Sequence, residues 1–250
     1  MVKSEQIVGF VKLLEKFRKT IITMFVIVII VSSFMYFEAD YIIGILSKPV
    51  HGVDLYFMRP AEGMMVKMKI AFLGGIIISF PFIAYLLIHE TGSRLTVKVR
   101  RILYFFVTPV AILLFIMGVL FGYKLLLPST IDFLLDCGNE FMKANLSGDN
   151  YFSFVITMLL TTGLIFELPL FLIALSRINI INSKMLKEKR KIALMVSLIA
   201  VALITPSVDA MTFILVALPI TGLYEISIWC VYLLEKKDER NQSSKLEKSA

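Results

Sequence analysis

Residues 151–171 read YFSFVITMLLTTGLIFELPLF, an apolar run with one carboxylate, Glu167, and a proline two residues later at Pro169. Together with its flanks the run covers 151–176, which is long enough for a helix that crosses the bilayer, since about 20 residues are needed. A charge at the centre of such a helix costs at least about 2.5 kcal/mol. The stretch therefore predicts a membrane protein that keeps a polar group in its membrane-spanning part for a reason.

The rest of the chain has the composition of an integral membrane protein. Of its 250 residues 58% are hydrophobic and 18% are charged, and the mean hydropathy is +0.84, which is too apolar for a soluble domain of this length. Further apolar runs cover 21–37, 70–88 and 102–123. A last run, 192–234, is roughly twice the length of one span and contains the turn signal TPSVD at 205–209. We therefore predict an all-α polytopic fold with six transmembrane helices, the last two of them short.

The distribution of Lys and Arg predicts the orientation of these helices. Twenty of the 26 lie in four segments, which are 1–19, 88–101, 176–191 and the tail from 235 onward. Only three lie in the segments that alternate with these, and three lie at the ends of spans. Because positively charged loops stay in the cytoplasm, we predict that both termini are cytoplasmic. Topology then explains the net charge of +7, which calls for no nucleic-acid partner.

The polar segments outside the spans make three smaller predictions. YIIGIL at 41–46 and TIDFLL at 130–135 are apolar pieces of otherwise acidic outer loops, and they predict short helices at the outer face. The polar sequence KKDERNQSSKLEKSA predicts a disordered cytoplasmic tail over 236–250. The six-span membrane domain accordingly covers 1–235.

No motif predicts an enzyme, a metal site or a bound cofactor. The sequence has no glycine-rich phosphate loop and no nucleophile at a telling distance from a base. Its two cysteines, Cys137 and Cys230, belong to different segments and predict neither a disulfide framework nor a metal site.

Two carboxylates lie inside the predicted spans, Glu167 and Glu225. Each could be a protonated or hydrogen-bonded carboxyl that fastens helices together. A functional role is stronger for Glu167, because Pro169 frees a backbone carbonyl one turn earlier and bends the helix, which helps to form a polar recess. Prolines in three other spans predict further bent helices around a concave face, and these are Pro81, Pro109 and Pro219.

Specific motifs accompany these features. The fourth span has an aromatic start, a glycine and a Phe-Glu-x-Pro sequence, at Tyr151, Phe154, Gly163, Phe166, Glu167 and Pro169. The final turn and last span contribute Thr205, Pro206, Asp209, Pro219, Tyr224 and Glu225. Supporting positions are Pro49, Glu62, Lys69, Gly74, Gly118, Phe121, Tyr123 and Pro128. Over about 12–235 the chain resembles the TatC family, the multi-span subunit of the twin-arginine protein translocase.

The resemblance implies a receptor in the cell inner (plasma) membrane, and not an enzyme. Members of this family bind the signal peptides of folded precursors on the cytoplasmic side. They assemble, in complexes with more than one copy, with single-span partners of the TatA and TatB type. Export is driven by the proton gradient, without ATP or a bound cofactor.

The resemblance also implies where the signal peptide binds. The family presents one glutamate before the first span and one in the first cytoplasmic loop, and carboxylates pair with guanidinium groups in a bidentate manner. This sequence departs from the pattern, because Lys16 and Val99 occupy those positions. We predict that the nearby acids Glu15 and Glu90 take over this role. The basic residues around them that we include in the site are Arg18, Lys19, Arg100 and Arg101.

For the intramembrane part we predict that a partner's transmembrane helix docks near Glu167. The predicted docking residues are Tyr151, Phe154, Phe166, Glu167, Pro169 and Asp209. Structural roles are expected for Pro49, Glu62, Lys69, Pro206, Pro219 and Glu225. The alternative is a proton-coupled small-molecule or ion transporter that uses Glu167 as its proton site. Such transporters often contain an inverted repeat, and the two halves of this chain are not similar.

Overall fold

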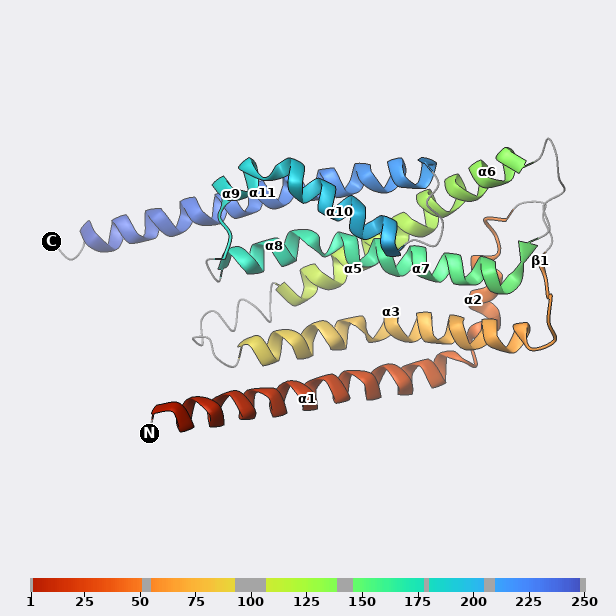
Figure 1. The fold of residues 1–250 in the computed structure, drawn as a ribbon, viewed down its shortest axis with the longest axis horizontal. Helices are drawn as coiled ribbons and strands as arrows, with labels where there is room; N and C mark the ends of the chain where they lie inside the picture. Colours follow the sequence, from red (N-terminus) through yellow and green to blue (C-terminus); the bar gives the residue numbers. More distant parts are fainter. Residues whose placement is uncertain are drawn as a thin grey trace. The chain divides into compact units, whose positions relative to one another are not determined.

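The computed structural model describes residues 2–50, 55–92, 107–138, 146–177, 180–204 and 210–247, and its long elements are all helices (Figure 1). This agrees with the predicted all-α class, because a helix satisfies its backbone groups internally where no water is present. The chain divides into two compact units. The first contains 1–113 and 145–156, and the second contains 114–144 and 157–250.

The first unit is built on two long helices that run side by side, α1 (Val2–Met35) and α3 (Glu62–Gly92) (Figure 1). They approach closely where Gly75 faces Ser32, since a Cβ atom at Gly75 would overlap the serine side chain. The short helix α2 (Ala39–Leu46) also packs on α3, and it confirms the helix predicted over 41–46. The strands β1 (Leu55–Tyr56) and β2 (Leu146–Ser147) pair in parallel before α7 (Gly148–Phe166) begins.

One continuous run of helix extends from Thr108 to Gly138. It consists of α5 (Thr108–Phe121), the π-helical turn η2 (Gly122–Leu126) and α6 (Leu127–Gly138). Pro128 has no N–H to donate to the preceding turn, and a wider π turn is one way in which a helix accommodates such a defect. The helix predicted over 130–135 is confirmed as part of α6.

The second unit is completed by α8 (Leu168–Arg177), α9 (Ser183–Glu188), α10 (Arg190–Ile204) and α11 (Ala210–Glu247), and α11 packs on the other three. The buried stripe of α11 recurs every three to four residues and consists of Val216, Ile220, Tyr224, Ile228 and Val231. Large apolar side chains such as Leu218 and Trp229 are exposed on the same helix. A bilayer would cover these side chains.

Glycines allow α5 and α7 to come close together inside the second unit. A Cβ atom added to Gly118 would lie 2.6 Å from the carbonyl oxygen of Thr162 and 2.9 Å from Cα of Gly163. One added to Gly163 would lie 2.7 Å from the ring of Phe115, which is itself buried. Because lipid gives no hydrophobic driving force for helix association, membrane helices associate through close packing, and small residues at the crossing allow that packing.

Within the described residues, five helical segments are long and apolar enough to cross a membrane. They are Arg18–Met35, Glu62–Leu86, Thr108–Asp136, Gly148–Arg177 and Phe213–Lys236. The remaining predicted span corresponds to α10, which has 15 residues and rises only about 22 Å. The structure therefore supports five candidate spans, while the sixth and the concave face stay predictions.

Most of the polar tail continues the helix α11. We expected disorder over 236–250, but α11 continues as helix to Glu247. Lys, Glu, Arg and Gln are good helix formers, so a tail rich in them extends a helix that is already nucleated by the span before it.

The glycine crossing can be tested by a matched pair of substitutions. Gly118→Ala should lower the free energy of unfolding by about 1–3 kcal/mol, because the new methyl group meets backbone that cannot move aside easily. Gly222→Ala is the control, since no atom lies within 4 Å of its Cβ position and alanine favours the helix. Thermal unfolding in detergent measures both. Equal melting temperatures for the two variants would contradict the close packing of α5 against α7.

Candidate functional site

Glu167 lies at a break between two helices. Helix α7 ends at Phe166 and α8 begins at Leu168, so Glu167 is the single residue between them. Its N–H donates to the carbonyl of Leu164 at 3.1 Å, and its own carbonyl accepts from the N–H of Phe171 at 3.0 Å. The hydrogen bond before Glu167 joins residues three positions apart, and the one after it joins residues four positions apart, as in an α-helix. Pro169 is tolerated in the first turn of α8, where its missing N–H has no helical partner to lose.

The Glu167 carboxylate is one of three described side chains with a buried polar atom that lacks a hydrogen-bond partner, and the other two are Ser32 and Ser79. The Oε1 atom of Glu167 is buried and makes no hydrogen bond within the described residues. The neighbouring Phe166 is buried, and its ring lies 5.5 Å from that of Phe121. A buried oxygen without a donor costs about 1–3 kcal/mol, so a donor brought to this position would be worth more than one at the surface.

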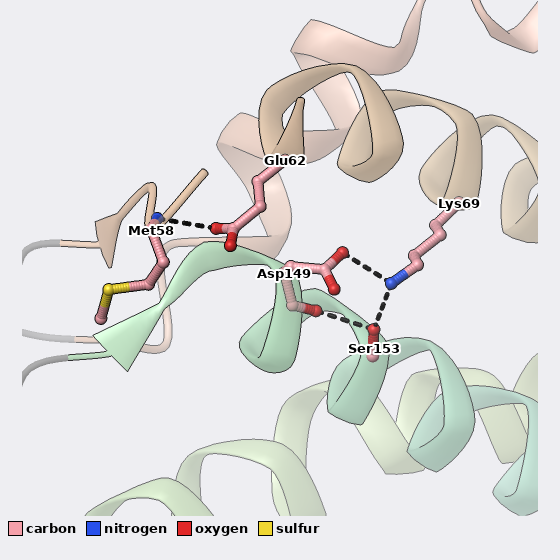
Figure 2. A network of polar contacts seen from close by, with 5 residues as sticks. All are labelled: Met58, Glu62, Lys69, Asp149 and Ser153. Carbon is pink, nitrogen blue, oxygen red and sulfur yellow. Dashed lines mark hydrogen bonds and ion pairs between the residues drawn. The ribbon is translucent and has the colours of Figure 1, made fainter. Parts of the chain in front are cut away.

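A polar network joins helices α3 and α7 in the first unit (Figure 2). Lys69 Nζ donates to Asp149 Oδ1 at 2.6 Å and to Ser153 Oγ at 2.9 Å, and Ser153 Oγ donates to the carbonyl of Asp149 at 2.7 Å. Next to this group, Glu62 Oε2 accepts the backbone N–H of Met58 at 2.9 Å. Glu62 and Lys69, which we expected to be structural, thus both fix the beginning of α3.

Tyr151 adds a second link in the same region. Its side chain is 6% exposed, and its hydroxyl donates to the carbonyl of Leu46 at 2.6 Å. This residue was predicted for partner docking, and the structure places it inside the fold. Phe154 is half-buried one turn further along α7, and Pro49 is buried just after α2.

Glu225, the other intramembrane carboxylate, has a cationic partner. Its Oε2 lies 3.1 Å from a guanidinium nitrogen of Arg190, the first residue of α10. Beside it the hydroxyl of Tyr224 donates to the carbonyl of Leu186 at 2.9 Å. These contacts hold α9 and α10 against α11, as the structural role predicted for Glu225 requires. Pro219 lies within α11 itself.

The residues predicted to read the signal peptide are only partly described. Arg18 and Lys19 are exposed on α1. Glu15 lies on the same helix, and Glu90 lies in the last turns of α3. The side chains of these two acids are outside the described part. Arg100 and Arg101, together with Pro206 and Asp209, also lie outside the described residues.

Three residues of these networks were not predicted from the sequence to make these contacts. Asp149 and Ser153 belong to the network of Lys69, and Arg190 pairs with Glu225. Asp149 stands just before the aromatic start of the fourth span, in the first turn of α7, where an acid favours the helix dipole. That signal could have marked it, whereas Arg190 looked like any other residue of a positively charged loop.

The family model for the Sec-independent protein translocase protein (TatC) matches residues 12–219. The chain belongs to the TatC family. It is 34% identical over 227 residues to TatC of Carboxydothermus hydrogenoformans, covering 90% of this chain and 93% of that relative. It is 32% identical over 194 residues to TatC of Synechocystis sp., covering 76% and 75%. The crystal structure of the Twin Arginine Translocase Receptor TatC superposes with a TM-score of 0.76 at 30% identity, covering 88% of this chain and 98% of that one.

TatC membership establishes the class of the protein. The chain is a multi-pass membrane protein and a component of a Sec-independent translocase, and it is not an enzyme. Membership also favours the translocase over the small-molecule or ion transporter that uses Glu167. Within the described residues no group of His, Cys, Asp and Glu could hold a metal ion.

The Lys69 network of this TatC protein predicts unequal effects at two acids. Asp149→Asn should lower the free energy of unfolding by about 1 kcal/mol, because the ion pair is partly screened but the acid also favours the α7 terminus. Asp40→Asn is the control. Asp40 pairs with Lys67 from the first turn of α2, yet it is 70% exposed, and its loss should be hardly measurable. Thermal unfolding in detergent that ranks Asp40 above Asp149 would contradict the role of the network.

Proposed function

We propose that this chain is the receptor subunit of a twin-arginine translocase in the cell inner membrane. It binds the signal peptides of folded precursors, and it assembles with TatA- and TatB-type single-span proteins, in more than one copy, for export driven by the proton gradient. The observation that carries this proposal is the similarity to the twin-arginine translocase receptor over nearly the full length of both chains.

The proposal includes six spans with both termini in the cytoplasm. The charge asymmetry of the loops supports this orientation, and α10 followed by α11 supplies the two last spans. A cysteine at exposed Lys184 and one at exposed Met58, each in a cysteine-free background, should react with an impermeant reagent from opposite sides. Reaction of both from the outside would refute the orientation.

Recognition of the two arginines is assigned to Glu15 and Glu90. Glu15 is the one acid in the eight residues before the first span, and Glu90 is the one acid in the predicted first cytoplasmic loop, 88–101. Arg18, Lys19, Arg100 and Arg101 flank them and contribute to the same surface. Each carboxylate can accept a bidentate hydrogen-bonded pair from one guanidinium group.

Precursor binding tests this assignment directly. The double variant Glu15→Gln with Glu90→Gln should weaken binding of a twin-arginine precursor roughly ten- to hundredfold, which corresponds to about 1.5–3 kcal/mol for lost charge-assisted hydrogen bonds. Glu188→Gln removes an exposed acid from another loop and should leave affinity unchanged. Unchanged affinity in the double variant would show that the cargo is read elsewhere, for example by a partner subunit.

Glu167 is proposed as the docking point for a partner's transmembrane helix, and for the far end of the signal peptide. Support comes from its buried, unpaired oxygen and from its position at the break between α7 and α8. Of the docking residues predicted from the sequence, Phe166 and Pro169 lie next to Glu167 in the chain, at the end of α7 and in the first turn of α8. A polar residue on the partner helix would satisfy the carboxyl and fix the register, for about 0.6–2 kcal/mol.

Two substitutions separate docking from proton transfer. Glu167→Ala should weaken partner crosslinking and export while precursor binding stays near normal. Glu167→Gln keeps a hydrogen-bonding group and should be much milder. Glu225→Gln is the control, because it breaks an internal ion pair and should lower thermal stability more than partner assembly. If Gln is as damaging as Ala at position 167 while partner crosslinks persist, proton transfer replaces docking as the role of Glu167.

A further inference from the structure

A cavity of about 290 Å³ in the second unit has no role in the function described above. It is lined by Lys187 of α9, Arg190 of α10, and Ile228, Trp229 and Tyr232 of α11. Tyr232 lies three positions after Trp229 and four after Ile228, so its ring is a neighbour of both side chains on the helix surface. Lys187 Nζ lies 4.8 Å from the centre of the Tyr232 ring.

The walls of this cavity are held in place by contacts that do not use its lining. Tyr224 donates its hydroxyl to the carbonyl of Leu186 at 2.9 Å. Glu235 accepts the N–H of Ser183 at 2.9 Å and also the hydroxyl of the same serine. The side chain of Asn182 caps α9 by accepting the N–H of Met185 at 2.7 Å. Helix α9 is thereby fixed on α11, and Lys187 is presented from a rigid support.

The charge at the cavity is positive. Arg190 is balanced by Glu225 at 3.1 Å. Lys187 has no carboxylate partner among the residues that the structure describes, and its recorded contact is the tyrosine ring. Lys236 adds a further cation 6.0 Å from the centre of the same ring. A ligand with one or two negative charges fits this balance.

The place of the cavity along the chain identifies the kind of anion. Trp229 and Tyr232 lie in the last turns of the candidate span Phe213–Lys236, where the helix leaves the hydrocarbon. Tryptophan and tyrosine are enriched at this depth, which is the level of the lipid headgroups. Basic pockets between transmembrane helices on the cytoplasmic side bind anionic headgroups. Trp229 is 66% exposed and can lie along the glycerol and upper acyl chains.

We propose that this cavity binds the phosphate group of an anionic phospholipid, with Lys187 and Arg190 donating to the phosphate oxygens and Trp229 and Tyr232 contacting the lipid body. The site shares no residue with those assigned to cargo recognition or with Glu167. A bound lipid would bridge α9, α10 and α11.

The chain provides its own probe, because Trp229 is its one tryptophan. The full chain is placed in phosphatidylcholine bilayers that contain either brominated phosphatidylglycerol or brominated phosphatidylcholine at the same fraction. Bromine quenches tryptophan fluorescence at short range. The anionic lipid should quench Trp229 with an apparent affinity about fivefold higher, as expected for one cation near a headgroup. Lys187→Gln should remove this preference, and Lys187→Arg should keep it.

Lys184→Gln is the matched control, since Lys184 is an exposed lysine of the same helix that does not line the cavity. It should retain the preference. Equal quenching by the two lipids in the unmodified protein would overturn the proposal, and so would equal losses in Lys184→Gln and Lys187→Gln. Inorganic phosphate is then added to bilayers of phosphatidylcholine alone. A change in Trp229 fluorescence there, without any lipid preference, would assign the site to a soluble anion instead.

Discussion

Hydrocarbon offers no hydrogen bonds to the backbone, and this constraint governs the whole structure. Every long element that the structure describes is therefore a helix, and at the irregular points backbone hydrogen bonds continue in a changed pattern. At Glu167 the backbone N–H bonds to the carbonyl of Leu164, and the backbone carbonyl accepts the N–H of Phe171. At η2 the chain widens into a π turn before Pro128 and then resumes as α6. Breaks in these spans are changes of bonding pattern, and they place side chains where a regular helix would not.

The two carboxylates within the predicted spans differ in whether they have a partner inside the protein. The Glu225 carboxylate lies 3.1 Å from a guanidinium nitrogen of Arg190, so its charge is paired within the chain. Glu167 has a buried carboxylate oxygen to which no described residue donates a hydrogen bond. Glu225 thus helps to hold α10 on α11, whereas Glu167 keeps a hydrogen-bonding position open.

Composition and periodicity were enough to predict the class of fold and the five long spans, because each span is a local property of about 20 residues. The break beside Pro169 also followed from local chemistry. Contacts between distant segments could not be predicted in this way. Nothing near Arg190 in the sequence distinguishes it from its basic neighbours, and nothing near Tyr151 shows that its hydroxyl reaches Leu46. The helix of α11 continues to Glu247, because the polar residues of the tail favour helix once a span precedes them.

The contacts at the beginning of α3 and α7 have a consequence for biosynthesis. Tyr151 bonds to a carbonyl 105 positions earlier, Lys69 to an acid 80 positions later, and Leu55 pairs with Leu146 in a parallel strand pair. A ribosome that adds about 5–20 residues per second needs about 5–20 s to make the intervening chain. During that interval the first two spans are already made, but Asp149, the partner of Lys69, and the strand that pairs with Leu55 are not yet synthesised. The first unit therefore closes only when the fourth span arrives, and insertion must hold the earlier helices ready for it.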